Sequence, residues 1–125
     1  MEILLLILLL QCKHCYADFK IQTYIQTVRK GIYRDPVGIS HSIDHIWTTY
    51  VVLGLFSIFY PLNLLSVILI GIIEGIVHYH IDWFKVRYGS KDSTSPIFWT
   101  QFGLDQLAHQ ATYCIMVAFL LWDKL

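Results

Sequence analysis

Apolar residues dominate four stretches of the chain, and polar or proline-containing connections separate these stretches. A bilayer core is about 30 Å thick, so roughly 20 apolar residues in a helix are enough to cross it. Three stretches reach this length, with breaks at residues 61–63 and 89–95. The pattern therefore predicts three membrane-spanning helices at about residues 40–60, 63–87 and 96–122.

The N-terminal stretch is shorter in its apolar part and continues as an amphipathic segment. Residues 3–10 are all apolar, and apolar positions then recur at helical spacing. We expect one long first helix over residues 3–29. The alternative is a cleaved signal peptide over residues 1–17, because a small-x-small pattern ends at Ala17. The segment, however, begins with Glu2 instead of a basic residue.

Composition and charge favour a membrane protein. The chain is 56% hydrophobic and only 14% charged, against about 25% charged in ordinary soluble domains. Nine basic and nine acidic residues cancel, so we expect no nucleic-acid partner. Eight of the nine basic residues fall within residues 13–34 or 85–91. The positive-inside rule then predicts that both termini lie outside. The fold class expected is an all-α, polytopic four-helix transmembrane bundle in the inner (plasma) membrane, with the lipid bilayer as its partner.

Polar residues recur at four-residue spacing in each expected helix, which places them on one helical face. The four stripes are His14 and Asp18 with Gln22, His41 and His45, Glu74 with His78 and Asp82, and Asp105 and His109. A polar side chain inside a membrane helix is costly unless it finds a partner. We therefore expect the stripes to meet in the bundle interior as a polar His/Asp core, towards the cytoplasmic side.

Imidazole and carboxylate together form a typical donor set for divalent metal ions. We predict one or two ions (Zn, Mn, Fe or Mg) bound by eight residues: His14, Asp18, His41, His45, His78, Asp82, Asp105 and His109. Gly71 and Gly75 share a face with Glu74 and would let another helix approach closely. The alternative is a core of interhelical hydrogen bonds, or a proton relay, without metal.

Four blocks of sequence resemble a small bacterial and phage membrane family known as domain of unknown function 3307. The blocks are His14-x-x-x-Asp18-Phe19-x-x-Gln22-Thr23, His41-x-x-x-His45, His78-x-x-x-Asp82-Trp83-x-Lys85 and Asp105-Gln106-x-x-His109. The resemblance covers most of the chain and implies an integral membrane protein with a polar His/Asp core. It implies no activity.

Three functions are compatible with these residues. The first is a metal-dependent membrane hydrolase of a lipid or lipid-linked phosphoester, with Glu74 as general base and Lys85 holding a phosphate oxygen. The second is ion or proton transport. The outer half of the second helix, the start of the third and the end of the fourth are almost entirely apolar, which argues against a path through the full depth. The third is a non-enzymatic phage or bacterial membrane factor with a structural metal or polar core.

Overall fold

The computed structural model describes residues 1–122, in which five α-helices and one π-helical turn account for the regular structure, with no strand. In chain order the elements are α1 (Glu2–Tyr16), η1 (Ala17–Ile21), α2 (Tyr24–Arg29), α3 (Pro36–Ser57), α4 (Leu64–Tyr88) and α5 (Pro96–Leu120). The all-α prediction is confirmed.

The helices α3, α4 and α5 begin at side-chain caps that satisfy free backbone N–H groups. Asp35 accepts hydrogen bonds from Val37 and Gly38 at the start of α3, and Asn63 accepts one from Ser66 at the start of α4. Proline follows the capping residue in α3 and α5, where a missing N–H costs nothing. These caps explain why α3 begins four residues before the predicted residue 40.

The expected first helix over residues 3–29 is divided into α1, η1 and α2. Gln22 and Thr23 have extended backbone conformations, and Thr23 starts α2 with a capping box. The Gln26 N–H donates to the Thr23 hydroxyl at 3.3 Å, while the Gln26 side chain accepts from the Thr23 N–H at 2.8 Å. This local signal competes with the apolar periodicity, which alone suggests a continuous helix.

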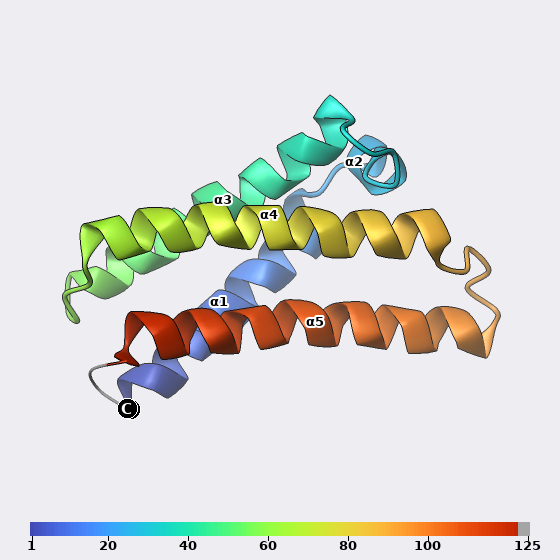
Figure 1. The fold of residues 1–125 in the computed structure, drawn as a ribbon. Helices are drawn as coiled ribbons and strands as arrows, with labels where there is room; N and C mark the ends of the chain where they lie inside the picture. Colours follow the sequence, from blue (N-terminus) through green and yellow to red (C-terminus); the bar gives the residue numbers. More distant parts are fainter. Residues whose placement is uncertain (123–125) are drawn as a thin grey trace.

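The four long helices form a ring of contacts in which α3 packs on α4, α4 on α5, α5 on α1 and α1 on α3 (Figure 1). The start of α1 and the end of α5 lie at one end of the bundle, together with the α3–α4 turn. The opposite end carries α2 and the α4–α5 loop. A Cβ atom on Gly71 would overlap the ring of Tyr50, and one on Gly75 would overlap Ile46. The two glycines therefore allow the close approach of α3 to α4.

The bundle interior is apolar near the first end and polar further along. The apolar cluster consists of Leu6, Leu10, Leu53, Phe56, Ile70, Tyr113, Met116, Val117 and Leu121. Large apolar side chains also cover much of the outer surface of every long helix. Along α4, the outward-facing residues include Leu65, Ile72 and Ile76, while Glu74 and His78 face inward.

Within residues 1–122, α4 is the one helix that is both long and apolar enough to cross a membrane. The prediction of four such spans is therefore not supported by helix length and composition. α1 has only 15 residues before the π-helical turn. The polar stripes of α3 and α5, with residues such as Asp44, His45 and Asp105, lower the hydropathy of these two helices.

Candidate metal centre

All eight predicted metal ligands come together in one buried cluster at the centre of the bundle. α1 supplies His14, η1 supplies Asp18, α3 supplies His41 and His45, α4 supplies His78 and Asp82, and α5 supplies Asp105 and His109. Their side chains are at most 8% exposed. The π-helical turn is a local departure from α-helical geometry of the kind frequently found at functional sites, and here it positions Asp18.

The first group within the cluster contains Asp18, His41, His45 and His78, whose donor atoms lie within 4.8 Å of one another. Asp18 Oδ1 is 3.1 Å from His41 Nε2, 2.9 Å from His45 Nε2 and 3.8 Å from His78 Nε2. Three imidazole nitrogens from two helices thus converge on one carboxylate oxygen. Three nitrogens and one oxygen also form a common coordination set for zinc.

His41 Nε2 has more close neighbours than one ring nitrogen can satisfy. It lies 3.1 Å from Asp18 Oδ1, 2.7 Å from Gln22 Nε2, 3.3 Å from His78 Nε2 and 3.4 Å from Asp82 Oδ2. A ring nitrogen carries either one proton or one lone pair. A shared cation among these donors would resolve the conflict without requiring several protons.

The second group contains Asp82, Asp105 and His109. His109 Nε2 lies 3.7 Å from both Asp82 Oδ1 and Asp105 Oδ1, beyond hydrogen-bond distance. Among the described side chains, four buried atoms have no hydrogen-bond partner: Asp105 Oδ1 and His109 Nε2 in this group, and the Nδ1 atoms of His41 and His78. Buried polar atoms of this kind are costly and require an explanation. A metal ion fits the donor atoms of the group.

Histidines connect the two groups. His14, His78 and His109 form a third set of donors within 4.8 Å of one another. The His78 ring lies 3.6 Å from the His45 ring and 4.3 Å from the His109 ring, measured between centroids. His78 Nε2 is also 3.2 Å from Asp82 Oδ2. The three groups of donors therefore form one continuous cluster.

Glu74, the predicted general base, lies beside this cluster. Its Oε1 accepts hydrogen bonds from Lys13 and from the Tyr113 hydroxyl, at 2.9 Å for Tyr113, and its Oε2 accepts from Thr49. Oε1 is 3.8 Å from His45 Nδ1. Both carboxylate oxygens are thus engaged by protein donors. This geometry fits an orienting role better than transfer of a proton from water.

Lys13 and Tyr113 extend the same network to a second histidine. The Tyr113 hydroxyl lies 3.1 Å from His14 Nδ1, and Lys13 Nζ lies 3.1 Å from both the Tyr113 hydroxyl and His45 Nδ1. The network therefore touches the Nδ1 atoms of two predicted ligands, whose Nε2 atoms face the cluster. Partners of this kind fix ring orientation and tautomer in metal sites.

The segment containing α2 packs over the cluster at the start of α3 and the end of α4. Lys30 Nζ donates to Asp82 Oδ2 at 3.0 Å, and Gln26 donates to Asp44 at 2.8 Å. At the start of α3, the hydrogen bond from Arg29 lowers the pKa of Asp35 below its ordinary value. These contacts hold the α2 segment against both α3 and α4.

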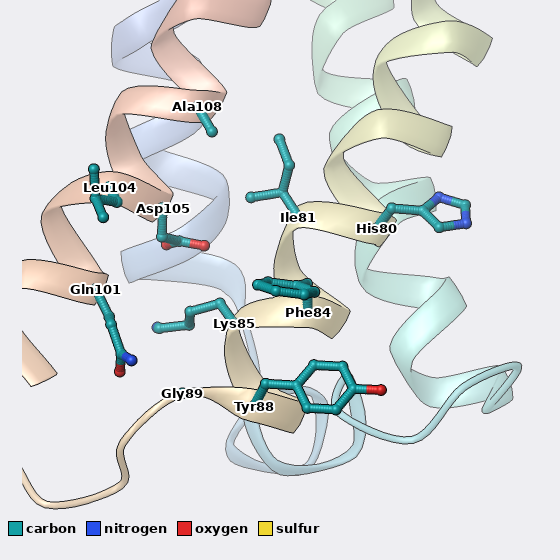
Figure 2. Close-up of a pocket in the computed structure, with 10 residues that line it drawn as sticks. All are labelled: His80, Ile81, Phe84, Lys85, Tyr88, Gly89, Gln101, Leu104, Asp105 and Ala108. Carbon is teal, nitrogen blue, oxygen red and sulfur yellow. The ribbon is translucent and has the colours of Figure 1, made fainter.

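Lys85, the predicted phosphate-binding residue, lies outside the cluster. It lines a cavity of about 600 Å³ between α4 and α5, which Asp105 also lines (Figure 2). Lys85 Nζ lies 5.1 Å from the centre of the Phe102 ring. Within residues 1–122, Lys85 forms no ion pair.

Sequence reasoning missed the roles of four residues in these networks: Lys13, Lys30, Thr49 and Tyr113. Thr49 and Tyr113 each follow a stripe histidine by four residues, so extension of the same spacing would have included them. From the sequence, Lys13 and Lys30 are predicted to act as charges that set membrane topology, with lipid headgroups as an alternative partner for Lys30. In the structure both are buried, at 5% and 6% exposure, each against a carboxylate. No sequence spacing identifies Lys30, because it follows α2 in a turn.

Comparison with known proteins gives a family and no further relative. No curated protein and no solved structure matches the chain significantly. The family model described as "Protein of unknown function (DUF3307)" matches residues 4–125. The chain, with its buried cluster of five histidines and three aspartates, therefore belongs to this family.

Proposed function

We propose that this chain is an integral membrane protein whose His/Asp cluster binds one or two divalent metal ions and hydrolyses a phosphoester. The observation that carries the proposal is the convergence of eight buried donors, two of which, on Asp105 and His109, have no hydrogen-bond partner. Such an arrangement is costly for folding unless a cation compensates the unpaired groups. The substrate class we favour is a lipid or lipid-linked phosphoester.

The distribution of polarity supports a membrane location. Among residues 1–122, fourteen polar or charged residues are buried, whereas large apolar side chains are exposed on α1, α3, α4 and α5. Exposed apolar surface on this scale marks contact with lipid or protein in folded chains. α4 meets the length and hydropathy of a membrane span, and most of that span faces outward. Basic residues such as Arg34, Arg87 and Lys91 occur at the end with α2, which we place on the cytoplasmic side.

The donor set indicates which ions fit. Five imidazoles favour Zn, Fe or Mn over Mg, because Mg prefers oxygen ligands and retains its water. Asp18 and the three histidines near it would hold one ion, and Asp82, Asp105 and His109 would hold a second. When bound, the ions would supply Lewis acidity for a phosphoester.

The residues of the chain contribute to hydrolysis by orientation and exclusion of water. Lys13 and Tyr113, both bound to Glu74, would hold His45 and His14, while the apolar cluster closes one end of the bundle. In the reaction, a water oxygen forms a bond to phosphorus and the ester P–O bond breaks. One proton of that water ends on the released alcohol and the other stays on the product phosphate.

Transport fits the arrangement less well. A conducting path needs polar groups through the full depth of the membrane. The half of the bundle with Leu10, Leu53 and Phe56 is filled by apolar side chains. A one-sided polar centre is better suited to chemistry at the membrane surface.

A pair of histidines on α4 provides the test. His78 belongs to the cluster, whereas His80 is exposed and its Nδ1 bonds the Ile76 carbonyl at 2.7 Å. In detergent-purified protein, metal content measured by mass spectrometry should be stoichiometric for the wild type and His80→Ala. In His78→Ala the metal content should fall by at least one equivalent per chain. The rate of phosphate release from dodecyl phosphate should fall in the same variant. A wild-type protein without stoichiometric metal would refute the proposal. Metal without hydrolysis would support a structural site.

A further inference from the structure

The cavity between α4 and α5 connects the outer surface of the bundle to the metal centre. Its volume of about 600 Å³ is within the range of small-molecule sites. Figure 2 shows Ile81 and Phe84 along the α4 wall and Leu104 and Ala108 on the α5 wall. These walls are mainly apolar, and the cavity opens where Phe84 and Leu104 are exposed.

Asp105 belongs to both the cavity and the cluster. Its carboxylate lies on the cavity wall (Figure 2), while its Oδ1 is the buried atom that faces His109 Nε2 without a hydrogen-bond partner. A molecule whose head group lies at Asp105 would therefore be next to the second group of predicted ligands. A metal bound there would offset the negative charge of Asp105.

Lys85 places a positively charged ammonium group in the cavity. Its side chain extends from α4 towards α5, below Asp105 (Figure 2). It is half-buried, and within residues 1–122 it makes no ion pair, unlike the buried lysines Lys13 and Lys30. Asp105 lies on the wall of the same cavity, but its carboxylate is not within ion-pair distance of Lys85 Nζ. A lysine on a mainly apolar cavity wall without a close ion pair is suited to bind an anion, and phosphate is a common partner.

We infer that the α4–α5 cavity binds a phosphate monoester of a long-chain alcohol, with its phosphate at Lys85 and its chain against the apolar outer surface. This inference rests on the proposed hydrolase function and specifies its substrate class. The apolar walls accept the first carbons of the chain, and Lys85 neutralises part of the phosphate charge. Asp105 joins this position to the metal centre, so the ester bond would lie beside the catalytic ions.

The test compares three probes in phosphatidylcholine nanodiscs. The probes are dodecyl phosphate, inorganic phosphate and dodecyltrimethylammonium, and binding is read as protection of lysines from acetylation, measured by mass spectrometry. Dodecyl phosphate should protect Lys85 and leave the exposed Lys91 unprotected. Inorganic phosphate should protect Lys85 only at concentrations at least tenfold higher, and dodecyltrimethylammonium should not protect it.

Substituted variants test the same binding without relying on lysine acetylation. Lys85→Ala should weaken binding of dodecyl phosphate, measured by calorimetry, by about tenfold or more, and Ala108→Phe should weaken it by filling the cavity. Lys91→Ala is the matched control and should bind as the wild type does. Equal binding of the cationic probe, or unchanged affinity in Lys85→Ala, would overturn the inference. Metal content of the same samples separates the two proposals, because intact metal with unchanged affinity refutes only the cavity assignment.

Discussion

The two halves of the bundle are built from the same four helices but differ in what stabilises them. In the apolar half, Leu10, Leu53 and Val117 are fully buried against other apolar side chains, and their burial alone is favourable. In the polar half, the same helices bury histidines, aspartates and two lysine–carboxylate pairs. Burial there is costly unless every charge and polar atom has a partner. Burial is therefore favourable by itself in the apolar half, whereas in the polar half it depends on partners for each buried charge, and we propose that metal ions are among these partners.

Removal of metal should produce the largest effect, and it should act only on the polar half. A ligand present at about 1,000 times its Kd stabilises the folded state by about 4 kcal/mol. Treatment with a chelator should therefore lower the melting temperature markedly and abolish hydrolysis of dodecyl phosphate. Addition of stoichiometric Zn²⁺ or Mn²⁺ should restore both. Differential scanning fluorimetry of the detergent-solubilised protein measures the shift.

Asp82→Asn is the matched variant for this prediction, because Asp82 contacts His41, His78, His109 and Lys30. The response of its melting temperature to chelator and to metal should be clearly smaller than that of the wild type, because the second ion loses a ligand while Asp18 and its histidines can still hold the first. A metal response in Asp82→Asn equal to that of the wild type would show that Asp82 is not a metal ligand.

The buried Lys13–Glu74 pair belongs to the hydrogen-bond network between the two halves. Lys13→Met leaves Glu74 buried without its cation, and breaking one side of a buried pair costs about 3–5 kcal/mol. The double variant Lys13→Met/Glu74→Gln should recover a large part of this loss. Urea unfolding of the single and double variants measures the coupling. Additive losses would mean that the pair does not act as a unit. Metal affinity should also fall in Lys13→Met, because His45 Nδ1 loses a partner.

Substitution in the apolar half should destabilise the protein without affecting metal. Leu53 is fully buried, and Leu→Ala substitutions at such positions cost about 2–5 kcal/mol. Leu53→Ala should therefore unfold at lower urea concentration than the wild type. Its metal stoichiometry, and the size of its response to chelator, should be unchanged. Loss of metal in this variant would show that the two halves are not separable.

The sequence contains most of this division but not all of it. Four-residue spacing places His78 with Asp82 and Asp105 with His109 on single helical faces. These faces turn inward here, while the other faces of α4 and α5 expose apolar side chains. Spacing within one helix says nothing about which stripes meet across helices. The contact of Lys13 with Glu74, 61 residues apart, depends on packing of α1 against the rest of the bundle.

The break after η1 was missed for a different reason. Apolar periodicity continues through residues 17–28, and it favoured one helix over residues 3–29. The Thr23–Gln26 capping box is a short signal that outweighs this periodicity locally. The break lets α2 fold against α3 and lets Lys30 reach Asp82. The capping box therefore determines that α2 packs over the polar half of the bundle.

The smallest effect is expected at the rim of the polar half, where the Arg29–Asp35 pair is accessible to solvent on the Arg29 side. The hydrogen bond from Arg29 lowers the pKa of Asp35 below its ordinary value of 3.8. The stabilisation is therefore fully present above about pH 4 and is lost as the pH falls through the lowered pKa. Asp35→Asn keeps a side-chain oxygen that can cap α3 but lacks the charge. The wild type should melt slightly above Asp35→Asn at pH 7, and this difference should vanish at the acid end of a pH series. A difference that persists there would assign the stabilisation to the cap instead of the ion pair.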